Sequence, residues 1–291
     1  MNRRLRGILK LMGWSIGGFV LLLTAFAGLL AFPGFMFAHE VAFANLSAYS
    51  DDDRSEALAP VLQEIHARIT QSTIDAPATT HRIFFGNDKP LFGFLQNARA
   101  RLVQATIGQT PSATYNASWP PQVSHVVTFR MPDFDRGKLV SESWPKTQDT
   151  AYLLTHEITH SLVLERLGMR RAAALPLWKA EGYPDYVAAT VIRHAASYSL
   201  RDSMTRLMHA DLASMRTATG DIQPLDYRCI GQSYVTIETG DFWNTCYYLS
   251  RLLVEYQIDV KGLTFDELMA PAVNDVDSWR ELRAAYEAGR L

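Results

Sequence analysis

His156-Glu157-Ile158-Thr159-His160 is the stretch around which the rest of the chain can be interpreted. In a helix, side chains four residues apart lie one above the other on the same face. Two imidazoles in that arrangement can hold one Zn²⁺ ion, and the glutamate between them then lies beside the metal, where a general base for an attacking water is needed. If the segment is helical, the pattern H-E-x-x-H predicts a catalytic zinc site.

The neighbouring residues favour a helix around this motif. Residue types that commonly cap helices occupy positions 147–150, and apolar residues then recur at roughly helical spacing up to Leu167. Gly168 follows, and a glycine in that place is a common C-terminal stop signal. We therefore predict a helix that ends at Gly168. The alternative is a buried helix whose two histidines are merely hydrogen-bonded within the core.

A second segment, residues 177–186, offers the rest of a zinc site. Catalytic zinc takes three protein ligands and keeps one position open, and in His₂Glu sites the third ligand is a carboxylate from a following helix. Glu181 is the candidate for that ligand. Asp185 lies one helical turn further on, where its carboxylate could accept the free N–H of a ligand histidine and fix its tautomer.

H-E-x-x-H followed after about twenty residues by Trp-x-x-Glu-Gly resembles the gluzincin metallopeptidases, the clan of thermolysin and the M1 aminopeptidases. The close match covers residues 148–189. The resemblance implies a zincin-like domain with His156, His160 and Glu181 as zinc ligands and Asp185 as the carboxylate behind them. It also implies that Glu157 takes a proton from the attacking water and returns it to the leaving amine. Activity should fall below about pH 6, where histidines become protonated.

Two structural expectations accompany this resemblance. Pro184 has no amide hydrogen and is disfavoured inside a helix, so the helix that carries Glu181 should start or bend near residues 181–183. In gluzincin-like folds the strand before the metal-binding helix often forms the sheet edge along which a peptide lies. Residues 123–129 form a good candidate strand and should take that role.

The N-terminus has the pattern of a membrane segment. Arg3, Arg4, Arg6 and Lys10 precede residues 11–38, which contain no charged side chain. This run exceeds the roughly 20 apolar residues that cross a bilayer. The basic flank places the N-terminus in the cytoplasm, so the catalytic part should lie outside, in a periplasm or the extracellular space. A cleaved signal peptide is the alternative, but the run is longer than the usual signal-peptide core.

The expected fold class is α+β, with a small sheet before the metal-binding helix and a mainly helical lobe after it. We predict a basic cytosolic tail over 1–10, a transmembrane anchor or uncleaved signal over 11–38, a connector over 39–54 and the metallopeptidase domain over 55–291. Within that domain, periodicity predicts a helix over 58–69 and a strand over 81–85.

Composition narrows the partners. The chain has 291 residues and a net charge of -2, and its basic cluster is confined to the N-terminus, so no nucleic-acid partner is predicted. We expect a peptide or protein substrate, Zn²⁺ as cofactor, and the membrane as a partner of the N-terminal helix. The alternative is a membrane-anchored binding or assembly protein that uses zinc structurally. Glu157 favours the enzyme, because a structural zinc site needs no base.

Two further groups of residues follow the motif. In M1-like peptidases a tyrosine or histidine from a later helix stabilises the oxyanion of the tetrahedral intermediate, and here Tyr234, Tyr247 and Tyr248 are the candidates. Cys229 and Cys246 are the only cysteines. In an exported domain they are predicted to form a disulfide, with two buried free thiols as the alternative.

Overall fold

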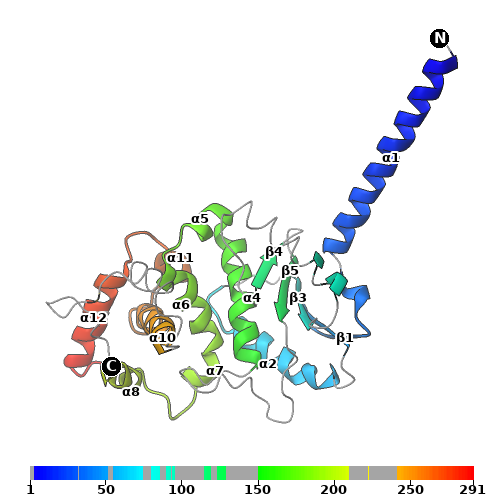
Figure 1. Ribbon diagram of the computed structural model, residues 1–291. Helices are drawn as coiled ribbons and strands as arrows, with labels where there is room; N and C mark the ends of the chain where they lie inside the picture. Colours follow the sequence, from blue (N-terminus) through cyan, green and yellow to red (C-terminus); the bar gives the residue numbers. More distant parts are fainter. Residues whose placement is uncertain are drawn as a thin grey trace.

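Helices and one small sheet make up the computed structural model, which describes residues 3–31, 33–51, 55–74, 80–85, 90–92, 94–95, 115–118, 123–128, 150–209, 222 and 241–291. The strands all come from the first half of the chain, and the second half is mainly helical (Figure 1). The predicted α+β class and the order of its parts, sheet first and helices after, are therefore confirmed.

The sheet contains five strands in the described residues, in the order β1-β2-β3-β5-β4. The strands are β1 (His39–Phe43), β2 (Leu46–Ser50), β3 (Thr80–Phe85), β4 (Tyr115–Ser118) and β5 (Val123–Thr128). β1 and β2 form an antiparallel hairpin, β3 and β5 continue parallel to β2, and β4 pairs antiparallel with β5. The mixed sheet thus ends in one antiparallel strand on each side.

The residues predicted to form a connector, 39–54, instead belong to the domain. They contain the β1–β2 hairpin, and Leu46 and Ala48 of β2 are buried in the main core. β1 alternates between half-buried and exposed positions, so its sequence contains no continuous apolar run. Only its pairing with β2 shows that this segment is part of the fold.

The strand that precedes the metal-binding helix is not the edge of the sheet. β5 is hydrogen-bonded to β3 on one side and to β4 on the other, so the prediction that it lies open to a substrate was wrong. The edge position belongs to β4, which among the described strands has a neighbour only on its β5 side. β4 also packs beside the metal-binding helix (Figure 1).

The helices after the first strand hairpin build the body of the domain. They are α2 (Leu58–Thr70), α4 (Thr150–Leu167), α5 (Met169–Ala173), α6 (Leu177–Ala188), α7 (Thr190–Arg193), α8 (Leu200–His209), α10 (Asp241–Glu255), the π-helical turn η5 (Tyr256–Val260), α11 (Phe265–Leu268) and α12 (Asp275–Glu287), with the short 3₁₀ turn η2 (Ser55–Ala57) before α2. The predictions for α2 and α4 are confirmed. α4 ends at Gly168, whose φ of 75° lies in the left-handed region that glycine adopts without strain.

α6 begins earlier than its proline suggested. Its first residue is Leu177, directly after Pro176, whose φ of -64° suits the start of a helix. Pro184 lies inside α6, so the expectation that a helix would start near residues 181–183 was wrong. Glu181 therefore sits in the second turn of an established helix. Burial explains the tolerance, since Trp178 and Tyr183 of α6 are almost completely buried and hold the helix in place.

α6 packs against both α4 and α10, and this three-helix contact forms the centre of the core. Leu154, Ile158 and Leu162 of α4 face the same apolar cluster as Leu249 and Leu252 of α10. Because α4 is buried on most of its surface, its few polar side chains occupy the one region where the core opens. That region holds the H-E-x-x-H motif.

The N-terminal helix α1 (Arg3–Ala31) projects from the domain (Figure 1). It is followed by the 3₁₀ turn η1 (Pro33–Met36), which leads into β1. Within the part of the chain that the structure describes, no helix combines the length and the hydropathy that crossing a membrane requires. The anchor over residues 11–38 stays a prediction.

Candidate metal centre

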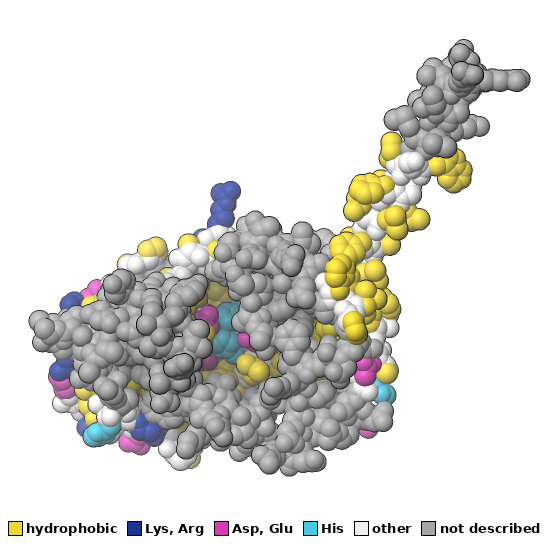
Figure 2. Space-filling model, viewed as in Figure 1, with side chains coloured by type: hydrophobic (Ala, Val, Ile, Leu, Met, Phe, Trp, Pro, Cys, Tyr) yellow, Lys and Arg dark blue, Asp and Glu magenta, His cyan; other side chains and the backbone are white. Residues whose placement is uncertain are grey.

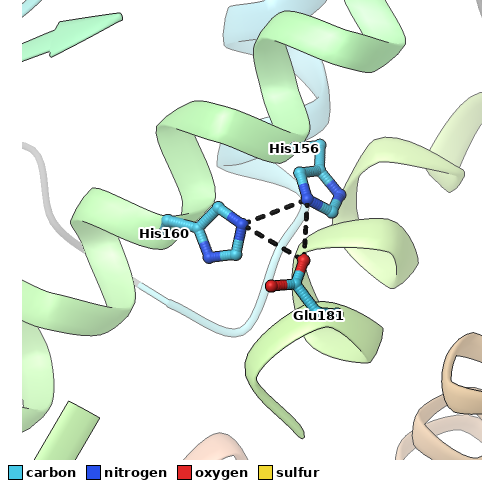
Figure 3. A group of neighbouring side chains, drawn as sticks. All are labelled: His156, His160 and Glu181. Atoms are coloured by element: carbon cyan, nitrogen blue, oxygen red, sulfur yellow. Dashed lines mark hydrogen bonds and ion pairs between the residues drawn. The ribbon is translucent and has the colours of Figure 1, made fainter. Parts of the chain in front are cut away.

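Three side chains from α4 and α6 converge on one point (Figure 3). Nε2 of His156 lies 3.1 Å from Nε2 of His160. Oε2 of Glu181 lies 3.3 Å from the first of these nitrogens and 3.5 Å from the second. The fold thus brings together the two histidines of the motif and the glutamate that follows them by about five helical turns of chain.

These separations fit a tetrahedral zinc ion. Zinc bonds of about 2.05 Å to nitrogen and oxygen place the corners of a tetrahedron roughly 3.3 Å apart. The three measured separations, 3.1, 3.3 and 3.5 Å, scatter around that value. The side chains of His160 and Glu181 remain 31% and 21% exposed, so a fourth position would face solvent. An open fourth position distinguishes a catalytic zinc site from a structural one.

The open side of the cluster can be seen on the molecular surface. Figure 2 shows histidine and acidic side chains at the bottom of a hollow in the face that it presents. A substrate could therefore reach the three ligand atoms from solvent without a rearrangement of α4 or α6.

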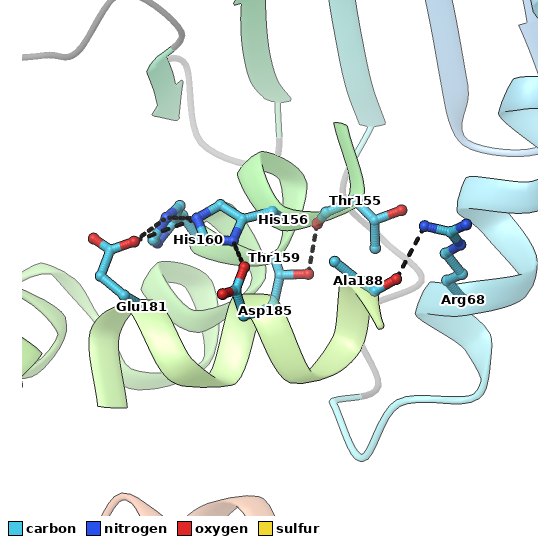
Figure 4. Close-up of polar contacts among 8 residues, drawn as sticks. All are labelled: Arg68, Thr155, His156, Thr159, His160, Glu181, Asp185 and Ala188. Carbon is cyan, nitrogen blue, oxygen red and sulfur yellow. Dashed lines mark hydrogen bonds and ion pairs between the residues drawn. The ribbon is translucent and has the colours of Figure 1, made fainter. Parts of the chain in front are cut away.

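Asp185 fixes the orientation of the first histidine (Figure 4). Its Oδ1 lies 2.8 Å from Nδ1 of His156, and both side chains are buried. A hydrogen on Nδ1 donated to this carboxylate leaves the lone pair of Nε2 directed at the metal position. Asp185 is one turn beyond Glu181 on α6, so a single helix provides a metal ligand and the group that orients another.

The charges at the site are strongly coupled. Burial works against protonation of His156, but hydrogen bonds to Asp185 and Glu181 and their negative charges prevail, so its pKa is well above the ordinary value. Burial likewise opposes ionisation of Glu181, yet the neighbouring histidines lower its pKa. Burial raises the pKa of Glu157, against the opposing influence of His160 and His156. A carboxylate with a raised pKa is a better proton acceptor, as a general base requires.

Of the three tyrosines predicted as oxyanion candidates, the structure brings one to the site. The ring of Tyr247 lies 6.2 Å from the ring of His156. Burial raises the pKa of Tyr247, and the charges of Glu181, Asp185 and Glu157 and a hydrogen bond with Glu181 raise it further. Tyr248 points away, since its hydroxyl donates to the backbone oxygen of Ser203. Tyr234 lies outside the described residues.

The sequence analysis missed Tyr152, which stands behind Asp185. Tyr152 is buried, its pKa is raised by burial and by the charge of Asp185, and it makes a hydrogen bond with that carboxylate. The guanidinium of Arg251 on α10 opposes this shift. A signal existed in the sequence, because Tyr152 precedes His156 by the same four residues that separate the two histidines, which places all three on one face of α4.

A buried arginine supports α6 from the side opposite the metal position. Arg68 of α2 donates from Nη1 to the backbone oxygen of Ala188, at the last residue of α6, over 2.9 Å (Figure 4). A cation at a helix C-terminus is stabilised by the unpaired carbonyls and the helix dipole. Arg68 also pairs with Glu64 on its own helix. The position of α6, and hence of Glu181, is in this way tied to α2.

α6 and α10 approach each other closely at Gly182. A Cβ atom at this position would lie 2.6 Å from the backbone oxygen of Ser250, which is too close for any side chain. Gly182 follows the ligand Glu181, and Ser250 lies one turn beyond Tyr247. The glycine therefore sets the distance between the helix that carries the third ligand and the helix that carries the tyrosine.

We expect Gly182→Ala to destabilise the domain by about 1 to 3 kcal/mol, because overpacking against backbone exceeds the roughly 1 kcal/mol that alanine gains over glycine in a helix. Thermal unfolding of the full chain in detergent would measure the loss. Gly17→Ala is the matched control, since its added methyl group meets no atom within 4 Å. Equal unfolding temperatures for the two variants would contradict the close contact.

The cysteine prediction can be checked at one of its two positions. Cys246 of α10 is disulfide-bonded, and no described cysteine is free. Cys229, the only other cysteine of the chain, lies outside the described residues. The alternative of a free thiol at Cys246 is therefore wrong.

No family model, curated protein or solved structure matches this chain. The functional argument therefore depends on the residues of the site and on their geometry.

Proposed function

We propose that this protein is a zinc-dependent peptidase of the gluzincin type, held at a membrane by its N-terminal helix. The observation that carries the proposal is the spacing of His156, His160 and Glu181, whose ligand atoms form three corners of a zinc-sized tetrahedron. Glu157 lies on the same helix between the two histidines, where a base belongs. The fourth corner faces solvent.

The chain's own residues provide the proton transfers of hydrolysis. Zn²⁺, when bound, would supply a Lewis acid that acidifies a water molecule and polarises a carbonyl group. Glu157 then accepts the proton of the attacking water and delivers it to the leaving amine. Asp185 keeps the imidazole of His156 in the tautomer that binds metal. Tyr247 is placed to donate a hydrogen bond to the oxygen on which negative charge develops.

A peptide is the substrate class that the sheet supports best. The outer edge of β4 has no partner among the described strands, and β4 packs beside α4. An extended peptide that added to this edge would receive main-chain hydrogen bonds along its length. Its backbone would then run past the helix that carries His156 and His160. The role that the sequence analysis gave to β5 is thus proposed for β4.

Membrane attachment is the second part of the proposal. The described side chains of α1 are predominantly apolar and exposed, and the basic residues of the chain's first ten positions precede them. This order predicts a cytoplasmic N-terminus and a catalytic domain on the opposite side, in a periplasm or the extracellular space.

Tyr247→Phe should lower kcat about 10- to 1000-fold and leave zinc content and KM nearly unchanged, because it removes one hydrogen bond that is made mainly in the transition state. Cleavage of a quenched fluorescent peptide library by the zinc-loaded full chain would measure the effect. Tyr248→Phe is the matched control, since the hydroxyl of its parent residue contacts backbone away from the site. A larger loss in the control than in Tyr247→Phe would refute the assignment.

Zinc affinity should weaken as pH falls, starting above pH 6.5. In the metal-free protein the pKa of His156 is raised above 6.5, so below that pKa a proton competes with zinc for the same nitrogen. Affinity should drop about tenfold per pH unit for each proton displaced. Competition titrations with a chromophoric chelator between pH 8.5 and 5.5 would measure the dependence. In Asp185→Asn, which lacks a group that raises this pKa, the decline should begin at lower pH.

A further inference from the structure

Large apolar side chains are exposed at the foot of α1, on the domain itself. Outside α1, the described residues with large exposed apolar side chains are Phe35, Leu91, Phe94, Val191, Ile192 and Val260. The two aromatic residues of this group, Phe35 and Phe94, are 69% and 62% exposed, and Leu91 is 55% exposed. We call Phe35, Leu91 and Phe94 the collar. Single exposed apolar residues are common on protein surfaces, but a local group of the largest ones indicates a binding surface.

One buried aromatic cluster holds both segments of the collar. Phe37, directly after η1, packs edge-on against Phe92 with ring centroids 5.0 Å apart, and both rings contact Phe84 of β3. Tyr49 of β2 stacks on Phe84 at 5.0 Å. The collar residues are therefore mounted on a packed base.

The local geometry directs the collar outward. Within the helical residues 90–92 and 94–95, Phe92 is buried while its neighbour Leu91 and the next turn's Phe94 are exposed. On the other segment, a Cβ at Gly34 would lie 2.7 Å from the ring of Tyr49, so η1 is pressed onto the cluster. Phe35 follows Gly34 and faces solvent. Each segment thus has one face on the cluster and one apolar face without cover in the described structure.

The collar continues an apolar surface that begins on α1. Leu21, Leu22 and Leu23 are consecutive and each is more than half exposed, so α1 presents apolar side chains on every side. A helix of that kind is stable in a membrane or in a protein core, and not in water. Figure 2 shows the hydrophobic surface running down α1 and onto the adjoining shoulder of the domain. This continuity indicates the same partner for both.

We propose that the collar inserts into the interfacial layer of the bilayer that holds α1, so that the domain lies against the membrane instead of swinging on a free tether. This inference rests on the membrane attachment proposed above and adds a second contact to it. Aromatic and aliphatic side chains favour the interface between headgroups and acyl chains. The carboxylates of Asp51 and Glu40, which lie nearby in sequence, already accept hydrogen bonds from the amide of Ala38 and the hydroxyl of Tyr49. Apolar contact therefore drives the docking, and a zwitterionic lipid suffices.

A nitroxide spin label tests the contact in the full chain. Phe94→Cys would be labelled and reconstituted into phosphatidylcholine vesicles, and collision rates with oxygen and with a water-soluble nickel complex would be compared. Cys246 is disulfide-bonded, so it does not take up the label. Val260→Cys is the matched control, because its parent side chain is 48% exposed in the helical part of the domain. We expect oxygen to dominate at position 94 and the nickel complex to dominate at position 260.

The possible outcomes are distinct. Adding Phe35→Ser and Leu91→Ser to the labelled chain should shift position 94 toward water while the chain still floats with the vesicles. Nickel-dominated relaxation at position 94 in a vesicle-bound chain would overturn the collar and leave the anchor intact. A chain that does not float with vesicles would overturn both. Dipolar broadening between labels would indicate a second copy of the chain on the collar and also overturn the proposal. Zinc content, measured in parallel, tests the metal centre independently.

Discussion

Glu157→Gln should lower kcat/KM for peptide cleavage by about 10²- to 10⁴-fold, the range in which a positioned general base contributes to catalysis. Glutamine has nearly the same shape as glutamate but cannot take a proton from water. Burial raises the pKa of Glu157, so the native carboxylate has the basicity that this step uses. Zinc content should not change, because the metal position is defined by His156, His160 and Glu181.

The matched control is Glu165→Gln, which alters an exposed glutamate two turns further along α4. Activity should be measured on zinc-loaded full-length protein in detergent, with a quenched fluorescent peptide library as substrate. Equal cleavage by the native chain and Glu157→Gln would place the base elsewhere. If all three chains bind zinc and none cleaves any peptide, the protein is instead a membrane-anchored binding or assembly protein with a structural zinc site.

The metal-binding helix was predictable because its information is local. The spacing of His156 and His160 depends only on helical geometry, and Gly168 ends the helix through its own backbone preference. The approach of Glu181 to the histidines is different in kind, since it requires α6 to pack on α4. That approach was expected only because the spacing of the motif resembles a known family of metallopeptidases.

Strand pairing could not be obtained from the same patterns. β1 and β2 were taken for a connector because short, half-exposed strands carry little periodicity, and their place in the fold depends on contacts with β3, some 35 residues later. The edge of the sheet was misassigned for a related reason. β4 lies in a stretch rich in turn residues, and only its pairing with β5 reveals it as a strand.

Side chains from distant helices were hard to assign for a third reason. Tyr247 and Tyr248 are adjacent in sequence and chemically identical, but they lie on different faces of α10 and reach different neighbours. The sequence could not rank them, because the ranking depends on how α10 is rotated against α6. Gly182 fixes part of that relation by letting the two helices touch. The choice of tyrosine therefore depends on tertiary packing.

Glu181→Ala should weaken zinc binding by more than about 100-fold, the upper range for loss of an outer carboxylate, because it removes a direct ligand and leaves two histidines. The native full chain should contain one zinc ion, measured by elemental analysis and chelator competition. Asp185→Asn should cost about 10- to 100-fold, since it disturbs only the tautomer and orientation of His156. Glu165→Ala, an exposed glutamate on α4, should bind as the native chain does.

The order of these three variants carries the argument further than any one of them. A metal held nonspecifically by surface carboxylates would respond equally to loss of Glu181 and of Glu165. A buried histidine pair with no metal role would bind no zinc in any chain, and Glu181→Ala would then act only on folding. Bound zinc also stabilises the folded state in proportion to its affinity, so unfolding temperatures with and without zinc should follow the same order. Agreement of affinity and unfolding temperature would establish that α4 and α6 together form the metal centre.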